Sequence, residues 1–398
     1  MRAQSTALSR ALDNRHVLGL LFLLPAAVLL LLFLTYPLGL GTWLGFTDAK
    51  IGRDGEWVGL ENFIYLWGDA VTRLALFNTL FYTVVASVIK FVLGLWLALL
   101  LNKHLPFKAF LRAIVLLPFI VPTALSAIAF WWIYDSQFSI ISWTLVKTGV
   151  ITEYIDFLGQ PWHARFATIA ANIWRGVPFV AICLLAGLQT ISPSYYEAAS
   201  LDGASDWQQF RYVTLPLLTP IIAVVMTFSV LFTFTDFQLI YVLTRGGPLN
   251  STHLMATLSF QRAISGGSLG EGAAIATAMV PFLLAAILFS YFGLQRRAWQ
   301  QFRYVTLPLL TPIIAVVMTF SVLFTFTDFQ LIYVLTRGGP LNATHLMATL
   351  SFQRAIPGGS LGEGAAIATA MVPFLLAAIL VSYYGLQRRA WQQGGSDK

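Results

Sequence analysis

Long apolar runs dominate the chain, and short polar connections separate them. A run of about 20 apolar residues is long enough to cross a bilayer as a helix. We therefore predict an all-α integral membrane protein. Its eight spans are expected at residues 17–40, 75–101, 109–134, 166–190, 217–243, 272–294, 309–335 and 364–386. The connections at 41–74 and 135–165 then share one side of the membrane, and both chain ends lie on the other.

The last two predicted spans repeat the two before them. Residues 207–298 match residues 299–390 at a constant offset of 92, and they differ at four positions: Ser251/Ala343, Ser265/Pro357, Phe289/Val381 and Phe292/Tyr384. This similarity is too high for an old structural repeat of the kind that builds transporter folds. A recent duplication through the shared Trp-Gln-Gln sequence explains the repeat, and an assembly error merging two close variants is the alternative. Either copy alone leaves six spans in 306 residues, which is 398 less 92.

Composition and charge place most of the chain in the membrane. Hydrophobic residues make up 58% and charged residues only 10%, against about 25% charged in a typical soluble domain. The net charge of +7 comes from basic residues at the ends of apolar runs. This positive-inside pattern predicts a cytoplasmic N-terminus and disfavours nucleic-acid binding. The first run is longer than the ~7–15-residue core of a signal peptide, so we expect an uncleaved span.

The sequence contains few candidates for catalytic or metal-binding residues. The single cysteine, Cys183, lies inside an apolar run, which excludes a disulfide framework. The sequence contains no metal-ligand spacing, no phosphate-binding P-loop and no nucleophile–base arrangement. We therefore predict neither an enzyme nor a cofactor.

The polar connection at 192–216 predicts a small two-helix structure outside the membrane. Ser192 or Ser194 caps a first helix, and Pro193 suits its first turn. Gly203 can end that helix with a positive φ, so that a second short helix leaves from about Asp206. An ordinary amphipathic surface hairpin is the alternative interpretation.

The same stretch resembles the coupling-loop signature of permease subunits in binding-protein-dependent ABC importers. The matching residues are Glu197, Ala198, Ala199, Asp202, Gly203, Leu215 and Pro216. Further marks of the carbohydrate branch follow in order: "VGLENF" at 58–63, "NTL" at 78–80, "LALLLN" at 97–102, "LLPFIVP" at 116–122, "IWRGVPF" at 173–179 and "LTRGGP" at 243–248. The set is similar to the maltose- and glycerol-3-phosphate-type permeases. It covers essentially all of the non-redundant 306 residues.

This resemblance implies a fold, a set of partners and a location. The fold is a six-span permease core, and 192–216 is its cytoplasmic coupling loop. The partners are a second permease subunit, a cytoplasmic ATPase dimer and an external solute-binding protein. ATP hydrolysis then belongs to the separate ATPase, and the chain lies in a bacterial inner membrane with both termini cytoplasmic. The implied cargo is a sugar or a similar polar solute.

Polar residues within spans are candidates for the substrate pathway. Asp236, with Gln238 and Tyr241 nearby, either faces a cavity or caps a helix end. Trp174 and Arg175 suit a sugar. The flat ring of Trp174 can stack on a sugar ring, and the guanidinium of Arg175 can donate hydrogen bonds to hydroxyl groups. Structural packing is the alternative role for Trp174. Lys90 contacts substrate, snorkels or pairs with an acid. The candidate set is Asn78, Tyr82, Lys90, Trp174, Arg175, Asp236, Gln238 and Tyr241.

The repeat leaves open which copy completes the core. Asp328, Gln330 and Arg337 are second-copy counterparts and cannot share the places of the first set. We expect residues 1–298 to form the core and 299–398 to form an appended hairpin and tail, because the first copy follows the coupling loop directly. The alternative is that the second copy displaces the first.

Three other functions stay open at this stage. The same importer class also includes permeases for glycerol phosphate or polyamines. An ion-coupled secondary transporter would leave the coupling-loop signature unexplained. A duplication product that inserts but does not assemble is the third.

Overall fold

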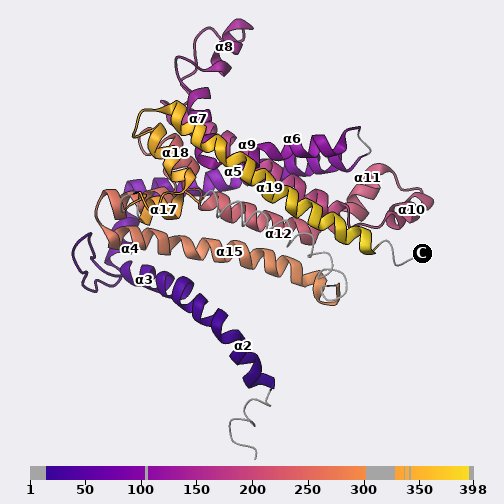
Figure 1. Cartoon of the computed structure of the whole chain (residues 1–398), viewed down its shortest axis with the longest axis horizontal. Helices are drawn as coiled ribbons and strands as arrows, with labels where there is room; N and C mark the ends of the chain where they lie inside the picture. Colours follow the sequence, from indigo (N-terminus) through magenta and orange to yellow (C-terminus); the bar gives the residue numbers. More distant parts are fainter. Residues whose placement is uncertain (1–14, 104–105, 302–327, 336, 340–341, 394–398) are drawn as a thin grey trace, which may run out of the picture. The chain divides into compact units, whose positions relative to one another are not determined.

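The computed structural model describes residues 15–103, 106–301, 328–335, 337–339 and 342–393 (Figure 1). Within these ranges the regular structure is helical, apart from two isolated β-bridges. The described part contains five helices long and apolar enough to cross a membrane, or six when one bent pair counts as a single span. The chain divides into two compact units, Met1–Gly68 with Ser259–Ala278, and Asp69–Leu258 with Met279–Lys398.

The first unit combines one span with a folded connection. Its helices are α2 (Arg15–Leu30), η1 (Leu31–Thr35), α3 (Tyr36–Leu44), α4 (Glu61–Gly68), η3 (Gln261–Ser265) and the start of α15 (Leu269–Gln301). The amide of Asn62 donates to the carbonyls of Gly45 and Thr47 at 2.9 and 2.8 Å, which closes the turn after α3. Arg262 and Glu271 form a partly buried ion pair at 3.2 Å. The connection predicted at 41–74 is therefore folded and hydrogen-bonded.

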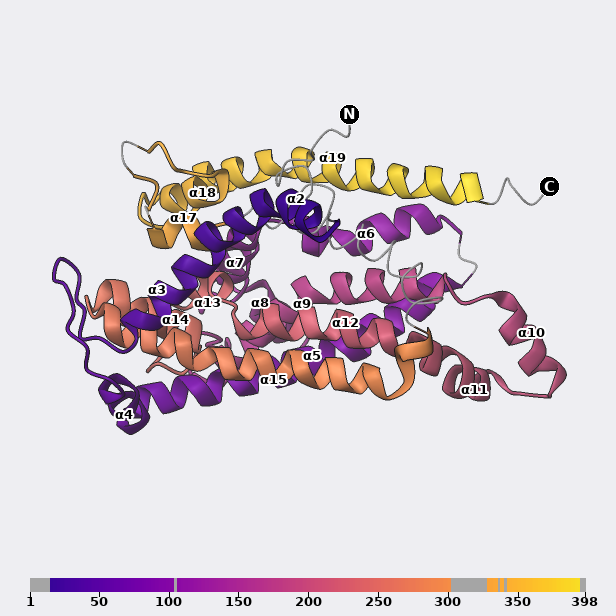
Figure 2. The same cartoon turned by 90° about the horizontal axis from the view of Figure 1, so that it is seen from below.

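The core of the second unit is built from three long helices, which lie side by side in Figures 1 and 2. They are α5 (Ala70–Asn102), α9 (Pro161–Leu188) and α12 (Leu215–Phe234), and α12 packs against both others. Small residues allow the close approach, as is common between helices in lipid. A Cβ added at Gly94 of α5 would lie 2.6 Å from Val180 Cγ1 of α9, and one at Gly187 of α9 would lie 2.6 Å from Ile221 Cδ1 of α12.

The predicted span 109–134 is two helices rather than one. α6 (Lys108–Ile120) and α7 (Thr123–Ile133) meet at an angle of 87°. Val121 and Pro122 between them have extended backbones. A proline removes a backbone donor and disfavours helix at the residue before it, so the helix ends at Ile120. The predicted span 109–134 is therefore broken at Val121 and Pro122, between the two helices.

The predicted span 217–243 is also interrupted. α12 ends at Phe234, and a short helix, α13 (Gln238–Leu243), begins after a break at residues 235–237. At its N-terminal end, α12 follows directly from a π-helical turn, η2 (Phe210–Thr214), which itself follows α11 (Asp206–Gln209). One nearly continuous helical run therefore links the polar connection at 192–216 to the break beside Asp236.

The described part of the second copy repeats the first copy locally. Its helices are α17 (Gln330–Leu335), α18 (Met347–Ala355) and α19 (Leu361–Gln393). The ring Nδ1 of His345 lies 3.1 Å from Thr349 Oγ1, and its first-copy counterpart, His253, lies 3.2 Å from Thr257 Oγ1. The predicted span 364–386 falls within α19. Most of the predicted span 309–335 falls on residues 302–327, outside the described residues.

Candidate substrate-pathway cluster and coupling loop

A buried polar cluster joins α5, α9 and α12 beside the break after α12. Its members are Tyr82 and Lys90 from α5, Asn172 from α9, Thr233 from α12 and Asp236 from the break, and each is less than a tenth exposed. Asp236 Oδ2 accepts hydrogen bonds from Tyr82 OH at 2.9 Å and from Asn172 Nδ2 at 2.8 Å. Lys90 Nζ donates to Asn172 Oδ1 at 3.0 Å and to Thr233 Oγ1 at 2.5 Å.

Asn172 is the bridge of this cluster. Its amide nitrogen donates to the carboxylate of Asp236, and its amide oxygen accepts from the ammonium of Lys90. Charged groups inside a membrane protein are costly unless they are paired or hydrogen-bonded. One neutral side chain thus offsets two opposite charges and connects helices that are distant in sequence.

The cluster includes three of the predicted pathway residues: Tyr82, Lys90 and Asp236. Asp236 Oδ1 also accepts from the backbone N–H of Leu239 at 3.3 Å, so the carboxylate contacts both the first turn of α13 and the cluster. Lys90 does not snorkel. It reaches Asp236 through Asn172.

The other predicted residues lie around the cluster rather than in it. Arg175 is half-buried, its Nε is enclosed without a hydrogen-bond partner among the described residues, and its charge lies close enough to interact with Asp236. Gln238 has an enclosed amide nitrogen that likewise lacks a partner in the described part. Trp174 is exposed and packs edge-on against Phe130 at 5.3 Å between ring centroids. Tyr241 OH lies 3.5 Å from Tyr333 OH of the second copy.

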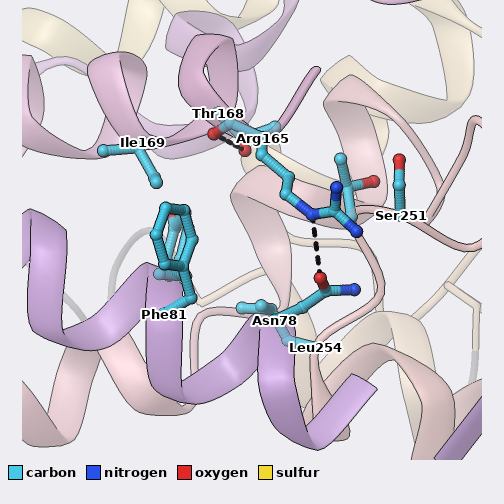
Figure 3. Close-up of a pocket in the computed structure, with 9 residues that line it drawn as sticks. Asn78, Phe81, Arg165, Thr168, Ile169, Ser251 and Leu254 are labelled. Atoms are coloured by element: carbon cyan, nitrogen blue, oxygen red, sulfur yellow. Dashed lines mark hydrogen bonds between the residues drawn. The ribbon is translucent and has the colours of Figure 1, made fainter. Parts of the chain in front are cut away.

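A small cavity lies along α5 and α9 near the cluster (Figure 3). Figure 3 shows Arg165 of α9 reaching toward Asn78 of α5, and Arg165 Nε donates to Asn78 Oδ1 at 3.0 Å. The amide nitrogen of Asn78 donates to the backbone carbonyls of Asn250 and His253. The cavity measures about 10 Å³, room for about one water molecule. This cavity is therefore too small to hold a molecule of sugar size.

The loop that contains Asn250 and His253, whose backbone carbonyls accept from Asn78, packs tightly around the neutral imidazole of His253. His253 is buried outside the spans, and burial lowers the pKa of its imidazole to about 4. Gly246 covers the ring with a φ of +90°, and a Cβ there would lie 2.2 Å from His253 Cε1. Gly246 therefore allows the loop to close over the histidine.

Sequence reasoning missed Asn172, Thr233 and Arg165. A signal for two of them was available, because Arg165, Thr168, Asn172 and Arg175 recur at helical spacing along one face of α9. Asn78, Tyr82 and Lys90 form a similar stripe on α5, at intervals of four and eight residues. Two polar stripes on neighbouring apolar helices indicate a shared interior.

The connection at 192–216, the candidate coupling loop, has the local structure that its sequence predicts. α10 (Pro193–Leu201) is capped by Ser192, with Pro193 in its first turn. Gly203 has a φ of +78°. α11 then starts at Asp206 behind a Ser205–Gln208 capping box. These predictions are confirmed.

The coupling loop extends beyond the ends of α9 and α12 in Figures 1 and 2. Tyr196 OH lies 3.0 Å from Thr214 Oγ1, which ties α10 to η2. Glu197 and Ala198 are exposed, and so are the large apolar side chains of Leu201 and Trp207. An exposed apolar surface on an otherwise polar projection is typical of a protein–protein contact.

Comparison with known proteins identifies the class. The family described as "Binding-protein-dependent transport system inner membrane component" matches residues 90–298, and the chain belongs to this family. It is therefore a membrane-embedded transport component. The trehalose/maltose transport system permease protein MalF of Thermococcus litoralis is 36% identical over 260 residues, 65% of this chain and 87% of that protein. The sulfoquinovosyl glycerol permease protein SmoG of Agrobacterium fabrum is 33% identical over 266 residues, 66% of this chain and 86% of that protein.

Solved structures show the same fold. A chain of a bacterial ABC transporter involved in the import of the acidic polysaccharide alginate matches with a TM-score of 0.63 at 25% identity, over 73% of this chain and 99% of that chain. The chains of these relatives are long enough for only one copy of the repeat. A probable ABC transporter permease of Pyrococcus horikoshii matches over 97% of its own length but only 70% of this chain. The family match also ends at residue 298, where the first copy ends.

Proposed function

We propose that this chain is the permease subunit of an ATP-driven importer that moves a sugar or a similar polar solute inward. The observation that carries the proposal is the helical run from the exposed coupling loop to the buried cluster at Asp236. Relatives named for trehalose, maltose and sulfoquinovosyl glycerol support a sugar-like cargo. Hydroxyl, amide and charged groups such as Tyr82, Asn172 and Lys90 suit a solute rich in hydroxyls.

The proposed partners are a second permease subunit, a cytoplasmic ATPase dimer and a solute-binding protein. One structural neighbour is an alginate transporter in complex with a periplasmic protein that carries an alginate pentasaccharide. ATP hydrolysis then takes place on the ATPase, and this chain performs no covalent chemistry. We infer that the coupling loop faces the cytoplasm, and the positive-inside charge pattern supports both termini on the same side.

In the proposed mechanism, the coupling loop moves with the ATPase and α12 carries the movement to the break at 235–237. There the hydrogen bonds of Asp236 join α5 and α9. Repacking these bonds opens the closed interior to the solute. We propose Asn78, Tyr82, Lys90, Trp174, Arg175, Asp236, Gln238 and Tyr241 as pathway residues, now with Asn172 and Thr233. We also propose that residues 1–298 form the working core.

The test is retention of the ATPase on a purified chain, combined with uptake into proteoliposomes. Gly203→Val should release the ATPase, because a β-branched residue at a φ of +78° strains the coupling loop by about 1–2 kcal/mol. Gly149→Val is the matched control, since Gly149 has a φ of +72° in another exposed connection and also has open space around it. ATP-dependent uptake of labelled trehalose or maltose, but not of glycerol phosphate, is expected. Uptake that follows an ion gradient, without any retained ATPase, would overturn the proposal.

A further inference from the structure

The polar connection at 192–216 joins α12 through a π-helical turn rather than through regular α-helix. In η2 the backbone N–H of Leu215 donates to the carbonyl of Phe210, five residues before it. Such turns insert one extra residue into a helix and are frequent at functional sites. Pro216 follows at once, and a proline has no backbone N–H to donate to the preceding turn. The backbone alone therefore holds this junction less firmly than a regular helix would.

A contact between two side chains reinforces the junction. Thr214, the last residue of η2, is 5% exposed, and its Oγ1 lies 3.0 Å from the phenol oxygen of Tyr196 on α10. The hydroxyl of Thr214 also donates to the carbonyl of Gln209 at 3.4 Å. With its hydrogen used in this way, Thr214 accepts from the hydroxyl of Tyr196. Thr214 therefore links α10 to both the π-helical turn and the end of α11.

The rest of the connection is tied together next to this contact. α11 is only four residues long, and a helix of that length is not stable without tertiary contacts. Gln209 Nε2 donates to Ser200 Oγ at 3.0 Å and to the carbonyl of Ala204 at 3.2 Å. These bonds hold α10 and α11 together. The contact between Tyr196 and Thr214 is the tie that reaches beyond α11 to η2.

The repeat provides a comparison within the sequence. Thr306 is the second-copy equivalent of Thr214. The repeat starts at residue 207, so "GLQRRA" precedes the second copy, and that copy includes no equivalent of Tyr196. The first copy alone is thus preceded in sequence by the tyrosine that makes this contact.

We propose that Tyr196 and Thr214 form a clamp that makes the coupling loop and α12 move as one body. With the clamp closed, a displacement of α10 reaches the break at 235–237. With the clamp open, the coupling loop pivots about η2 and α12 stays in place. Tyr196 and Thr214 are then positioning residues for transport, and this role rests on the proposed function of the chain.

The ratio of solute taken up to ATP hydrolysed tests the clamp, because a contact that serves folding alone would lower both rates together. Full-length chains are reconstituted in proteoliposomes with the ATPase, the second permease subunit and the solute-binding protein, and labelled trehalose is the probe. Thr214→Val and Tyr196→Phe each remove one hydroxyl with little change of shape. Thr214→Ser keeps the hydroxyl. Thr219→Val is the matched control, since the hydroxyl of exposed Thr219 donates within its own helix, to the carbonyl of Leu215 at 2.7 Å.

The net contribution of one hydrogen bond corresponds to about a fivefold change in a population. Thr214→Val and Tyr196→Phe should therefore each lower trehalose uptake per ATP by about fivefold, with retention of the ATPase unchanged. The double variant should lower the ratio no further, because both hydroxyls belong to one contact. Thr214→Ser and Thr219→Val should match the unaltered chain.

An unchanged ratio in both single variants would overturn the clamp and leave the proposed function standing. A loss of ATPase retention in parallel with the loss of uptake would also overturn the clamp, since the contact would then serve only to fold the coupling loop. An equal fall in Thr219→Val would do the same. An unaltered chain that retains no ATPase would overturn the proposed function, and the clamp with it.

Discussion

At the scale of single residues, the side chain that organises the site is neutral. The sequence draws attention to Lys90 and Asp236, because charges within apolar spans are conspicuous. Asn172 joins them, yet an isolated asparagine in a span gives a weak signal. Which polar groups meet depends on the register of α9 against α5, and this register comes from helix packing rather than from hydropathy.

Replacing Asn172 should show how much its two hydrogen bonds contribute to the stability of the protein. Asn172→Leu leaves two buried charges with one hydrogen bond fewer each, so we expect the free energy of unfolding to fall by about 3 kcal/mol. Thermal unfolding in detergent measures this loss. Adding Lys90→Met and Asp236→Leu to Asn172→Leu should recover part of the stability, because both buried charges are removed while the hydroxyl of Tyr82 loses its acceptor. A triple variant less stable than Asn172→Leu alone would contradict this account.

At the scale of helices, the apolar runs predict where the spans lie but not where they break. Hydropathy is similar on both sides of residues 121–122 and 235–237, so both interrupted spans look continuous in sequence. Pro122 indicated a kink, whereas the sequence before α13 contains no proline, and there Asp236 accepts a hydrogen bond from the backbone of Leu239. The coupling loop was predictable in detail because caps and glycine turns are local features.

The crossing of α5 and α9 gives a prediction at this scale. Gly94→Ala should lower the free energy of unfolding by about 1–3 kcal/mol, because the added Cβ would overlap Val180 at 2.6 Å. Gly39→Ala in α3 is the matched control, since nothing lies within 4 Å of its added Cβ. There the better helix propensity of alanine should leave stability unchanged or raise it by up to about 1 kcal/mol. Equal losses at both positions would show that packing is not the cause.

At the scale of the whole molecule, the repeat is what separates this chain from its relatives. In the structure α12 packs against α5 and α9, and Asp236 bonds to both. Asp328, the second-copy counterpart of Asp236, is half-buried, and the segment before it lies outside the described residues. This arrangement supports the proposed core of residues 1–298.

Deletion of one copy tests whether a single copy is sufficient for transport. A chain lacking 299–390 should take up solute at least as well as the full chain, because it keeps both the buried cluster and the coupling loop. A chain lacking 207–298 should behave almost identically, since the two short chains differ only at the four exchanged positions. Uptake rates in proteoliposomes with the same partners provide the measurement. Loss of uptake in both short chains, with uptake kept in the full chain, would mean that the second copy is required.

By itself the sequence determined the membrane class, most span positions, the coupling loop and the family resemblance. These depend on apolar length, local capping and short motifs, which act over a few neighbouring residues. The tertiary structure decided which polar residues meet, where two spans break and how the second copy is seated. Both copies have nearly the same sequence, so no local preference distinguishes them. We attribute the proposed core position of the first copy to connectivity, because that copy continues directly from the connection at 192–216 into α12.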